Sequence, residues 1–342
     1  MAKKILVTGG LGYIGSHTCV SLIQQGFEVL IVDDLSNSSV EVLDGIKKIS
    51  GASPEFLEID LRNKNEVHRL FEEHPDLSGV IHFAASKAVG ESVNKPLLYY
   101  ENNIGSMIHL LQAIEKKETI FPFIFSSSCT VYGQADEMPI TEQAPIKKAE
   151  SPYGNTKQIG EEILYDNTLS NHKLKVIALR YFNPIGGHPS LEIGELPKGK
   201  PQNLIPFITQ TAAGIHEKLS VFGDDYPTSD GTCIRDYIHV VDLAKAHVMG
   251  LKRMIENEQT DSFEVFNLGT GKGNSVMEVI KAFEEVSGVS LNYEVVSRRD
   301  GDIVEAYADT TKANKVLGWK AESDLHHALE TAWKWEKKIR NL

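Results

Sequence analysis

The sequence has few cysteines and no long apolar run. Only three cysteines occur in 342 residues, and their wide spacing fits neither a disulfide framework nor a zinc-ligand pattern. Such usage is typical of a protein whose thiols stay reduced, so we expect a cytoplasmic location. No apolar stretch approaches the roughly 20 residues that span a bilayer. The start of the chain shows no secretory-leader pattern, and we therefore expect neither export nor membrane insertion.

Positive charge is also scarce. Lys and Arg number 35 against 47 Asp and Glu, which gives a formal net charge of −12. This balance argues against a nucleic-acid partner and an anionic membrane surface, but it leaves room for a local basic pocket that binds a phosphorylated small molecule. The chain is long enough for two domains, and its apolar content of 41% is ordinary for a globular protein.

A glycine-rich turn follows the first predicted strand. Residues 5–7 are apolar and run into Gly9, Gly12 and Gly15, which open a helical pattern. Glycines at such a turn let a pyrophosphate approach the backbone and face a helix N-terminus. A second strand ends at Asp33, where a carboxylate suits a ribose 2′-hydroxyl and repels a 2′-phosphate. No arginine follows nearby in the sequence, so the combination predicts a dinucleotide site that prefers NAD to NADP.

Strands and helices continue to alternate through the first half. Further predicted strands, with helical stretches between most of them, cover residues 55–59, 79–83, 123–125 and 174–179. The order predicts an α/β fold, namely a Rossmann-type doubly wound parallel sheet with a smaller C-terminal α/β substrate lobe. We expect the NAD-binding domain to span residues 1–180 with returning segments near 235–255, and the lobe to take mainly residues 181–342.

A serine, a tyrosine and a lysine form a candidate catalytic set. Ser128 follows the fifth predicted strand, and such strand ends line the ligand crevice of an open α/β sheet. Tyr153 and Lys157 are four residues apart, so they share one face of a helix. Ser151 and Pro152 suit its N-cap and its first position. A nearby ammonium lowers a phenol's pKa from about 10, which makes tyrosine a usable acid/base. Alone, the Tyr–Lys spacing also fits an ordinary exposed helix pair.

Taken together, these features resemble the extended short-chain dehydrogenase/reductase superfamily, and longer motifs narrow the resemblance to the UDP-glucose 4-epimerase family. The similarity runs from about residue 3 to about residue 335. The motifs that carry it are residues 8–18 (TGGLGYIGSHT), 82–92 (HFAASKAVGES), 125–133 (FSSSCTVYG), 179–184 (LRYFNP) and 231–240 (GTCIRDYIHV).

The resemblance implies inversion at C4 of a UDP-sugar by transient oxidation, with NAD that stays bound through turnover and with no metal. Tyr153 would be the acid/base, Lys157 would lower its pKa and bind the nicotinamide ribose, and Ser128 would hydrogen-bond the sugar hydroxyl. The expected cofactor contacts are Gly9, Gly12, Tyr13, Ile14, Gly15, Asp33, Asn37, Asp60, Leu61, Phe83, Ala84, Ala85, Lys87, Asn102, Tyr153, Lys157 and Phe182. The expected substrate contacts are Ser128, Tyr153, Asn183, Asn203, Leu204, Val221, Phe222, Arg235, Arg299, Asp302 and Ala306.

Two features concern the substrate more closely. Arg235 and Arg299 are candidates for the diphosphate, because a guanidinium offers two parallel hydrogen bonds; a surface ion pair is the alternative for each. In this family the residue four positions after the Asp of the Arg-Arg-x-Gly-Asp segment limits the room beside the sugar's C2. Asp302 is that Asp, so the position is Ala306. Its small size leads to the hypothesis that UDP-N-acetylglucosamine and UDP-N-acetylgalactosamine are substrates as well.

The resemblance also implies a homodimer, paired through helices near residues 99–115 and 152–167.

Other activities stay open. A nucleotide-sugar 4,6-dehydratase needs an Asp-Glu pair where Val131 and Tyr132 stand. A decarboxylase or C5-type relative is another possibility, as is a net reductase, which would release its cofactor. A non-catalytic NAD-sensing module would have no need of an intact Ser–Tyr–Lys set.

Overall fold

The computed structural model describes residues 2–299 and 301–342. Residue 300, which belongs to the predicted arginine-rich segment 297–302, therefore lies outside the described residues. The chain forms two compact units. Unit 1 contains Met1–Gly133, Pro145–Arg180 and Ala244–Phe266, and unit 2 contains Gln134–Ala144, Tyr181–Leu243 and Asn267–Leu342. Within the described ranges, no helix is long and apolar enough to cross a membrane.

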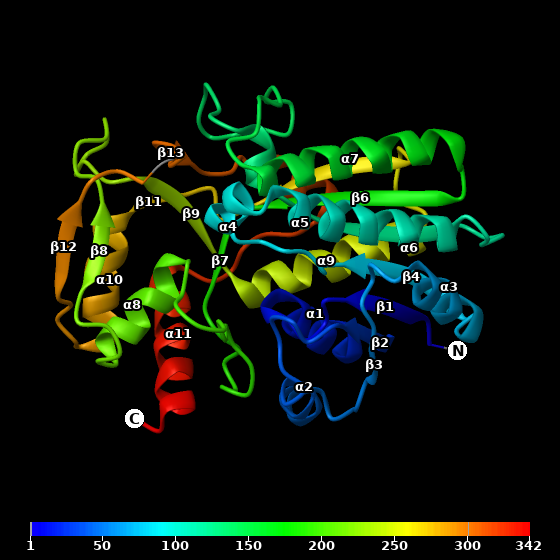
Figure 1. Cartoon of the computed structure of the whole chain (residues 1–342), viewed down its shortest axis with the longest axis horizontal. Coiled ribbons are helices and arrows are strands. Elements are labelled where there is room, and N and C mark those ends of the chain that lie inside the picture. Colours follow the sequence, from blue (N-terminus) through cyan, green and yellow to red (C-terminus); the bar gives the residue numbers. More distant parts are fainter. Residues whose placement is uncertain (1, 300) are drawn as a thin grey trace. The chain divides into compact units, whose positions relative to one another are not determined.

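Unit 1 is built on a seven-stranded sheet with the order β10-β6-β5-β4-β1-β2-β3 (Figure 1). The strands are β1 (Lys4–Thr8), β2 (Glu28–Asp33), β3 (Glu55–Glu58), β4 (Leu77–His82), β5 (Phe121–Ser128), β6 (Leu174–Tyr181) and β10 (Phe263–Leu268). β3, β2, β1, β4 and β5 pair in parallel, with Val7 of β1 opposite Ile31 of β2 and Ile81 of β4. This is the doubly wound Rossmann order, so the predicted fold class is confirmed.

Helices cover both faces of this sheet (Figure 1). They are α1 (Tyr13–Gln24), α2 (Val42–Ser50), α3 (Lys64–Glu73), α4 (Val89–Asn94), α5 (Pro96–Tyr100), α6 (Ser106–Ile114), α7 (Pro152–Ser170) and α9 (Val240–Ile255). On one face, side chains such as Leu110 of α6 and Leu164 of α7 form a core with Phe123 of β5. On the other, Gly250 of α9 lets that helix approach Ile124. The order of the strands reverses between β1 and β4, which makes their carboxyl ends the expected ligand site.

The predicted helix over residues 99–115 is interrupted. A π-helical segment, η1 (Glu101–Gly105), separates α5 from α6. Asn103 in this segment accepts a hydrogen bond from the Ser86 N–H at 2.8 Å and donates to the Ser86 carbonyl at 3.0 Å and to Thr156 Oγ1 at 3.0 Å. The wider turn thus brings an amide side chain to the loop after β4, which is a common use of a π-bulge at a ligand site.

Unit 2 is smaller and combines short strands with helices. Its strands are β7 (Asn183–Ile185), β8 (Leu219–Phe222), β9 (Ile234–His239), β11 (Gly273–Ser275), β12 (Tyr293–Val296) and β13 (Glu305–Ala306). Its helical segments are α8 (Leu204–Ala212), α10 (Val276–Ser287), the π-helical η3 (Ala313–Leu317) and α11 (Leu325–Arg340). β9 pairs with β7, β11 and β13, while β8 pairs with β12. Trp333 of α11 meets Phe283 of α10 edge-on, with 5.7 Å between the ring centres, so this C-terminal helix contributes to the core of unit 2.

Candidate active site

The glycine turn between β1 and α1 has no room for side chains. Gly9 has a φ of +67°, and a Cβ there would lie 2.8 Å from the Ala84 backbone nitrogen. A Cβ at Gly15 would lie 2.2 Å from the Gly9 carbonyl oxygen. Gly12 is the N-cap of α1, so the N–H groups of the first turn, at Tyr13 and beyond, point toward the turn. This cradle fits the pyrophosphate of a dinucleotide, which the helix dipole also favours.

Asp33 is oriented by the loops around it. It ends β2, is 8% exposed, and accepts hydrogen bonds from the backbone N–H groups of Leu11 at 3.1 Å and Leu35 at 3.1 Å. The Ser38 hydroxyl also donates to it, at 2.6 Å. Asn37 is exposed in the same loop. The carboxylate is therefore fixed beside the glycine turn, where the sequence predicts a ribose contact.

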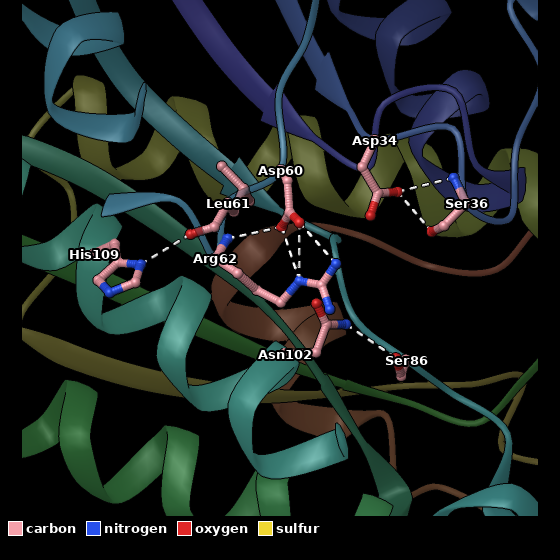
Figure 2. A network of polar contacts seen from close by, with 8 residues as sticks. All are labelled: Asp34, Ser36, Asp60, Leu61, Arg62, Ser86, Asn102 and His109. Carbon is pink, nitrogen blue, oxygen red and sulfur yellow. Dashed lines mark hydrogen bonds and ion pairs between the residues drawn. The ribbon is translucent and has the colours of Figure 1, made fainter. Parts of the chain in front are cut away.

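An arginine that the sequence does not single out lies near this end of the site (Figure 2). The Arg62 guanidinium forms a bidentate ion pair with Asp60. Its Nε lies 3.0 Å from both carboxylate oxygens and its Nη2 lies 2.7 Å from Oδ2. This ion pair lowers the pKa of Asp60, and Asp60 and Asp34 raise the pKa of Arg62. Leu61 is buried, and its carbonyl accepts a hydrogen bond from the His109 ring at 2.9 Å. Because Arg62 is already paired with a carboxylate, it does not undo the expected preference for NAD.

The end of β4 lies against β1. The Phe83 N–H donates to the Thr8 carbonyl at 3.0 Å, and the Ala84 N–H donates to Thr8 Oγ1 at 3.4 Å. Ala84 and Ala85 are half-buried, and the closeness of Ala84 to Gly9 shows that the two strand ends adjoin. Small side chains here leave the backbone accessible to a flat ligand.

The loop after β4 continues to two more predicted contacts. Lys87 is exposed in that loop. Asn102 donates from Nδ2 to Ser86 Oγ at 2.9 Å, as Figure 2 shows. With Asn103, which the sequence does not single out, it ties the π-helical segment η1 to this loop. The predicted cofactor contacts between Gly9 and Asn102 therefore lie at or after the ends of β1, β2, β3 and β4, or reach the loop after β4 from η1.

The start of α7 follows the sequence prediction. Ser151 is the N-cap, and its hydroxyl accepts a hydrogen bond from the Gly154 N–H at 3.1 Å. Pro152 occupies the first helical position. Both choices stabilise the helix end, and they fix the first turn, which contains Tyr153.

Tyr153 and Lys157 share one face of α7, as predicted. Lys157 Nζ lies 5.8 Å from the centre of the Tyr153 ring and donates to the Ser126 carbonyl at 2.7 Å. Lys157 is 4% exposed, and this burial lowers its pKa to about 8. An ammonium held this close favours the phenolate form of the tyrosine. The pair is thus a built feature of the fold and not an exposed helix pair.

Ser128 ends β5, the strand whose Ser126 carbonyl accepts the hydrogen bond from Lys157. It is 7% exposed, and its hydroxyl accepts a hydrogen bond from the Thr130 N–H at 3.2 Å. That bond caps the short 3₁₀ helix η2 (Cys129–Tyr132). The hydroxyl proton is not used by this contact, so it is available for a ligand.

A buried histidine lies beneath the same region. His82 ends β4, is 3% exposed, and has Nδ1 2.7 Å from Thr8 Oγ1. Burial, and then the charge of Lys157, lower the pKa of His82 to about 3, so the ring is neutral at physiological pH. The sequence assigns no role to His82, although its place at a strand end was the available signal.

In unit 2 the two predicted arginines meet at one carboxylate. Arg299 donates to Asp302 from Nη2 at 2.7 Å and from Nε at 3.2 Å, and Arg235 Nη2 lies 3.9 Å from the same carboxylate. The Asp302 side chain is 12% exposed, whereas the Arg299 side chain is 55% exposed. Two guanidinium groups held together in this way could bind a diphosphate. The structure shows the ion pairs that were the alternative, because each arginine faces Asp302, and the diphosphate contact stays a prediction.

Ala306 lies beside Arg235. β13 pairs in parallel with β9, and Ala306 is opposite Arg235, so their side chains point to the same face. Ala306 is 2% exposed. Asp236, which points to the other face, accepts hydrogen bonds from the Thr270 hydroxyl at 2.6 Å and from the Ala308 N–H at 3.2 Å. This buried carboxylate holds β13 in register with β9.

The other predicted substrate contacts are spread over unit 2. Asn183 begins β7, opposite Tyr237 of β9. Asn203 is the N-cap residue of α8, which begins at Leu204. On β8, Val221 is buried and Phe222 is 41% exposed. The remaining predicted cofactor contact, Phe182, also belongs to unit 2 and is 3% exposed.

Known proteins resemble this chain over nearly its whole length. The family model described as GDP-mannose 4,6 dehydratase matches residues 6–332. A UDP-glucose 4-epimerase of Bacillus subtilis (strain 168) is 49% identical over 332 residues, which cover 97% of this chain and 96% of that protein.

Solved structures agree with the sequence comparison. A crystal structure of UDP-glucose 4-epimerase from Stenotrophomonas maltophila, with bound NAD and formylated UDP-arabinopyranose, has a TM-score of 0.94 at 46% identity and covers 99% of both chains. The UDP-glucose 4-epimerase of Bifidobacterium longum, in complex with NAD+ and UDP, has a TM-score of 0.94 at 44% identity and covers 99% of both chains.

Proposed function

The chain belongs to the UDP-glucose 4-epimerase family, and on that premise we propose that Tyr153, Lys157 and Ser128 carry out the proton transfers of a C4 epimerisation. The protein interconverts UDP-glucose and UDP-galactose with tightly bound NAD. The observation that supports these residue roles best is the buried Lys157 beside the Tyr153 ring, anchored to β5 just before Ser128. The test is incubation of the purified protein with UDP-galactose and no added cofactor. UDP-glucose should form, and its absence would refute the function.

We propose that unit 1 binds NAD. The glycine cradle from Gly9 to Gly15 would hold the pyrophosphate, and Asp33 would accept from the adenosine ribose. Asp60 and Leu61 would meet the adenine, where the amino group can donate to a carboxylate. Lys87 and Asn102 would lie along the phosphates and ribose. Lys157 would donate to the nicotinamide ribose.

The chemistry divides between cofactor and protein. NAD, when bound, accepts the hydrogen of C4 with its electron pair and returns it to the other face of the ketone. Tyr153, as phenolate, takes the proton of the C4 hydroxyl and gives it back on the return step. Lys157 keeps the phenolate accessible near neutral pH through its positive charge. Ser128 donates its unused hydroxyl proton to the substrate oxygen and holds it near Tyr153.

We propose that unit 2 binds the UDP group. Arg235 and Arg299 would hold the diphosphate, with Asp302 setting the orientation of both guanidinium groups. The expected contacts to the rest of the nucleotide and to the sugar are Asn183, Asn203, Leu204, Val221 and Phe222. Inversion requires the ketone to turn over between the two transfers, so the nucleotide must be held more firmly than the sugar.

Ala306 would extend the substrate range. Its side chain is small, buried and on the same face as the diphosphate ligand Arg235. A larger residue at this position would fill the space beside the sugar's C2. We therefore propose that UDP-N-acetylglucosamine and UDP-N-acetylgalactosamine are interconverted too.

A homodimer would cover an exposed apolar surface of unit 1. Leu97 of α5 is 81% exposed, Val93 of α4 is 60% exposed and Leu169 of α7 is 59% exposed. α4 and α5 both contact α7, so the three side chains belong to helices that pack together. Exposed apolar surface on such a group of helices favours an interface with a second copy of the chain. Light scattering should give twice the chain mass, and Leu97→Glu should reduce it to one.

We also propose a cytoplasmic location. Cys19, Cys129 and Cys233 are not joined by disulfide bonds. Such thiols are compatible with a reducing compartment.

A dehydratase is a weaker alternative. Its added acid/base pair would occupy the positions of Val131 and Tyr132, and both side chains are fully buried in η2. The Tyr132 hydroxyl accepts a hydrogen bond from Arg180 at 2.9 Å. It is therefore engaged inside the protein and unavailable to a substrate.

A further inference from the structure

Glu161 extends the Tyr–Lys stripe of α7 by one more turn. Tyr153, Lys157 and Glu161 recur every four residues, so all three lie on the same face of the helix. Glu161 is 8% exposed. None of the roles proposed for the epimerisation uses this buried carboxylate, and carboxylates are rarely buried unless they are paired.

Two side chains of α7 form hydrogen bonds with consecutive residues of β5. Lys157 Nζ donates to the Ser126 carbonyl at 2.7 Å, and the Ser127 hydroxyl donates to Glu161 Oε1 at 2.5 Å. Ser126 is 2% exposed and Ser127 is fully buried. The next residue along the strand is Ser128. The helix that contains the proposed acid/base is thus bonded directly to the strand that contains the proposed serine partner.

Arg180, at the end of β6, completes the arrangement. Its Nε donates to Glu161 Oε1 at 2.9 Å and its Nη2 donates to Oε2 at 2.5 Å, which forms a bidentate fork. Its Nη1 donates to the Tyr132 hydroxyl at 2.9 Å, and its guanidinium carbon lies 4.8 Å from the centre of that ring. Tyr132 ends η2, the turn that starts directly after Ser128. The bonds therefore run from the residue before Ser128 to the turn after it.

We propose that Glu161 is a positioning residue for the epimerisation: through Ser127, Arg180 and Tyr132 it holds Ser128 in place, and it does so one helical turn from Lys157 on the same face of α7. We call the four residues Ser127, Glu161, Arg180 and Tyr132 the Glu161 brace. This inference rests on the proposed function, because it assigns Glu161 a role through the Ser–Tyr–Lys set and not on the substrate itself.

The charges around Lys157 agree with this role. Burial lowers the pKa of Lys157 to about 8, and Glu161 is the group that raises it. His82 faces Lys157 from β4 and is neutral, because its pKa is lowered to about 3. Tyr153 faces it from α7, and Arg180 faces Glu161 from β6. Loss of the Glu161 charge would lower the pKa of Lys157 further. It would also leave the positive charge of Arg180 uncompensated, and this charge would lower the pKa of Lys157 in the same direction.

A buried ion pair alone says little about function, since such pairs also occur as purely structural features. Unit 1 contains a matched example. Arg253 Nε lies 2.9 Å from Glu264 Oε2 and Nη2 lies 3.1 Å from Oε1, and Glu264 is 5% exposed. The other partners of Glu264 are the N–H and the hydroxyl of Thr260. Glu264→Gln therefore makes the same chemical change in the same kind of pair, on β10.

The experiment compares Glu161→Gln with Glu264→Gln in the full chain, with kcat and KM for UDP-galactose measured from pH 6 to 10 and with retained NAD quantified. Both variants should lower the melting temperature. Only Glu161→Gln should lower kcat, by about tenfold or more, with KM and NAD content within about twofold. Only Glu161→Gln should shift the alkaline limb of the pH profile of kcat, by about one pH unit toward lower pH. Glu264→Gln should keep the wild-type profile.

Two further variants separate position from charge. Ser127→Ala removes the bond to β5 and keeps the carboxylate, so kcat should fall severalfold while the alkaline limb stays in place. Glu161→Asp keeps the carboxylate charge, so the alkaline limb of its kcat profile should lie at the wild-type pH. If Glu161→Gln matches Glu264→Gln in kcat and pH profile, or if Ser127→Ala keeps the wild-type kcat where Glu161→Gln does not fold, the inference is wrong. Failure of the wild-type protein to convert UDP-galactose would instead refute the proposed function.

Discussion

Lys157 on α7 donates a hydrogen bond from Nζ to the backbone carbonyl of Ser126 on β5, at 2.7 Å. This bond fixes an ammonium 5.8 Å from the centre of the Tyr153 ring and joins it to the strand that ends at Ser128. The bond thereby ties the start of α7, which contains Tyr153, to the strand that ends at Ser128. On the proposed mechanism, this ammonium is the group that makes Tyr153 usable as a base.

Replacing Tyr153 by Phe should abolish turnover and spare cofactor binding. Without the phenolate, no group of the set removes the C4 hydroxyl proton, and kcat should fall by about 10²- to 10⁴-fold. NAD content after gel filtration should match the wild-type value. Tyr293→Phe, an exposed tyrosine on β12, is the control and should leave kcat unchanged. If the kcat of Tyr153→Phe lies within about tenfold of the wild-type kcat, another group is the acid/base.

Removing the charge of Asp33 should weaken NAD binding. Its carboxylate is fixed by the N–H groups of Leu11 and Leu35, and we propose that it accepts a hydrogen bond from the adenosine ribose. Loss of a charged hydrogen-bond partner corresponds to about 10- to 100-fold in affinity, and NADP should be rejected less strongly. Asp34→Asn, at the exposed neighbour, should change NAD retention by less than about twofold. Equal effects of the two substitutions would place the ribose elsewhere.

Replacing Ala306 by Tyr should narrow the substrate range. A phenol on the buried face beside Arg235 would occupy the space proposed for the N-acetyl group. Turnover of UDP-N-acetylglucosamine should fall at least about 100-fold relative to UDP-glucose, the discrimination that a filled pocket can give. Parallel assays on the two UDP-sugar pairs test this. Absence of activity on the N-acetylated pair in the wild-type protein would refute the wider range before the variant is needed.

His82 should make the protein less stable in acid. Its pKa is lowered from about 6.5 in the unfolded chain to about 3 in the fold, so between these values the unfolded state binds the extra proton. The free energy of unfolding should therefore fall as pH drops below 6.5, by up to about 1.4 kcal/mol per pH unit from this group. His82→Gln removes the titration and should flatten the dependence. Chemical denaturation at several pH values measures both slopes, and identical slopes would contradict the account.

Features set by neighbours in the sequence were predictable. The glycine turn, Asp33 at a strand end and the Ser151–Pro152 start of α7 each depend on local backbone conformation, and the structure confirms the turn and the cap. The fold class followed from the alternation of strands and helices. A helix over residues 99–115 was expected and helical structure is present there, but the sequence did not reveal the π-helical segment η1 within it.

Contacts between distant residues were not predictable. Nothing in the sequence shows that Ser127 meets Glu161, because this contact depends on how α7 packs on β5. Nor does it show that Asp302 lies between Arg235 and Arg299, because that depends on how the loop before β13 packs on β9. The regular Tyr153–Lys157–Glu161 spacing was visible, but its third member had no local signal of function. Arg62 was also not identified from the sequence, since only the fold brings it near Asp34.

The central claim is that C4 is oxidised and reduced within one protein–cofactor complex. The most direct measurement follows UDP-galactose deuterated at C4 through incubation with the protein and no added cofactor. UDP-glucose should form with the deuterium retained at C4, because the hydrogen leaves and returns without meeting solvent. Loss of the label to water would contradict the account, and so would an absolute requirement for added NAD.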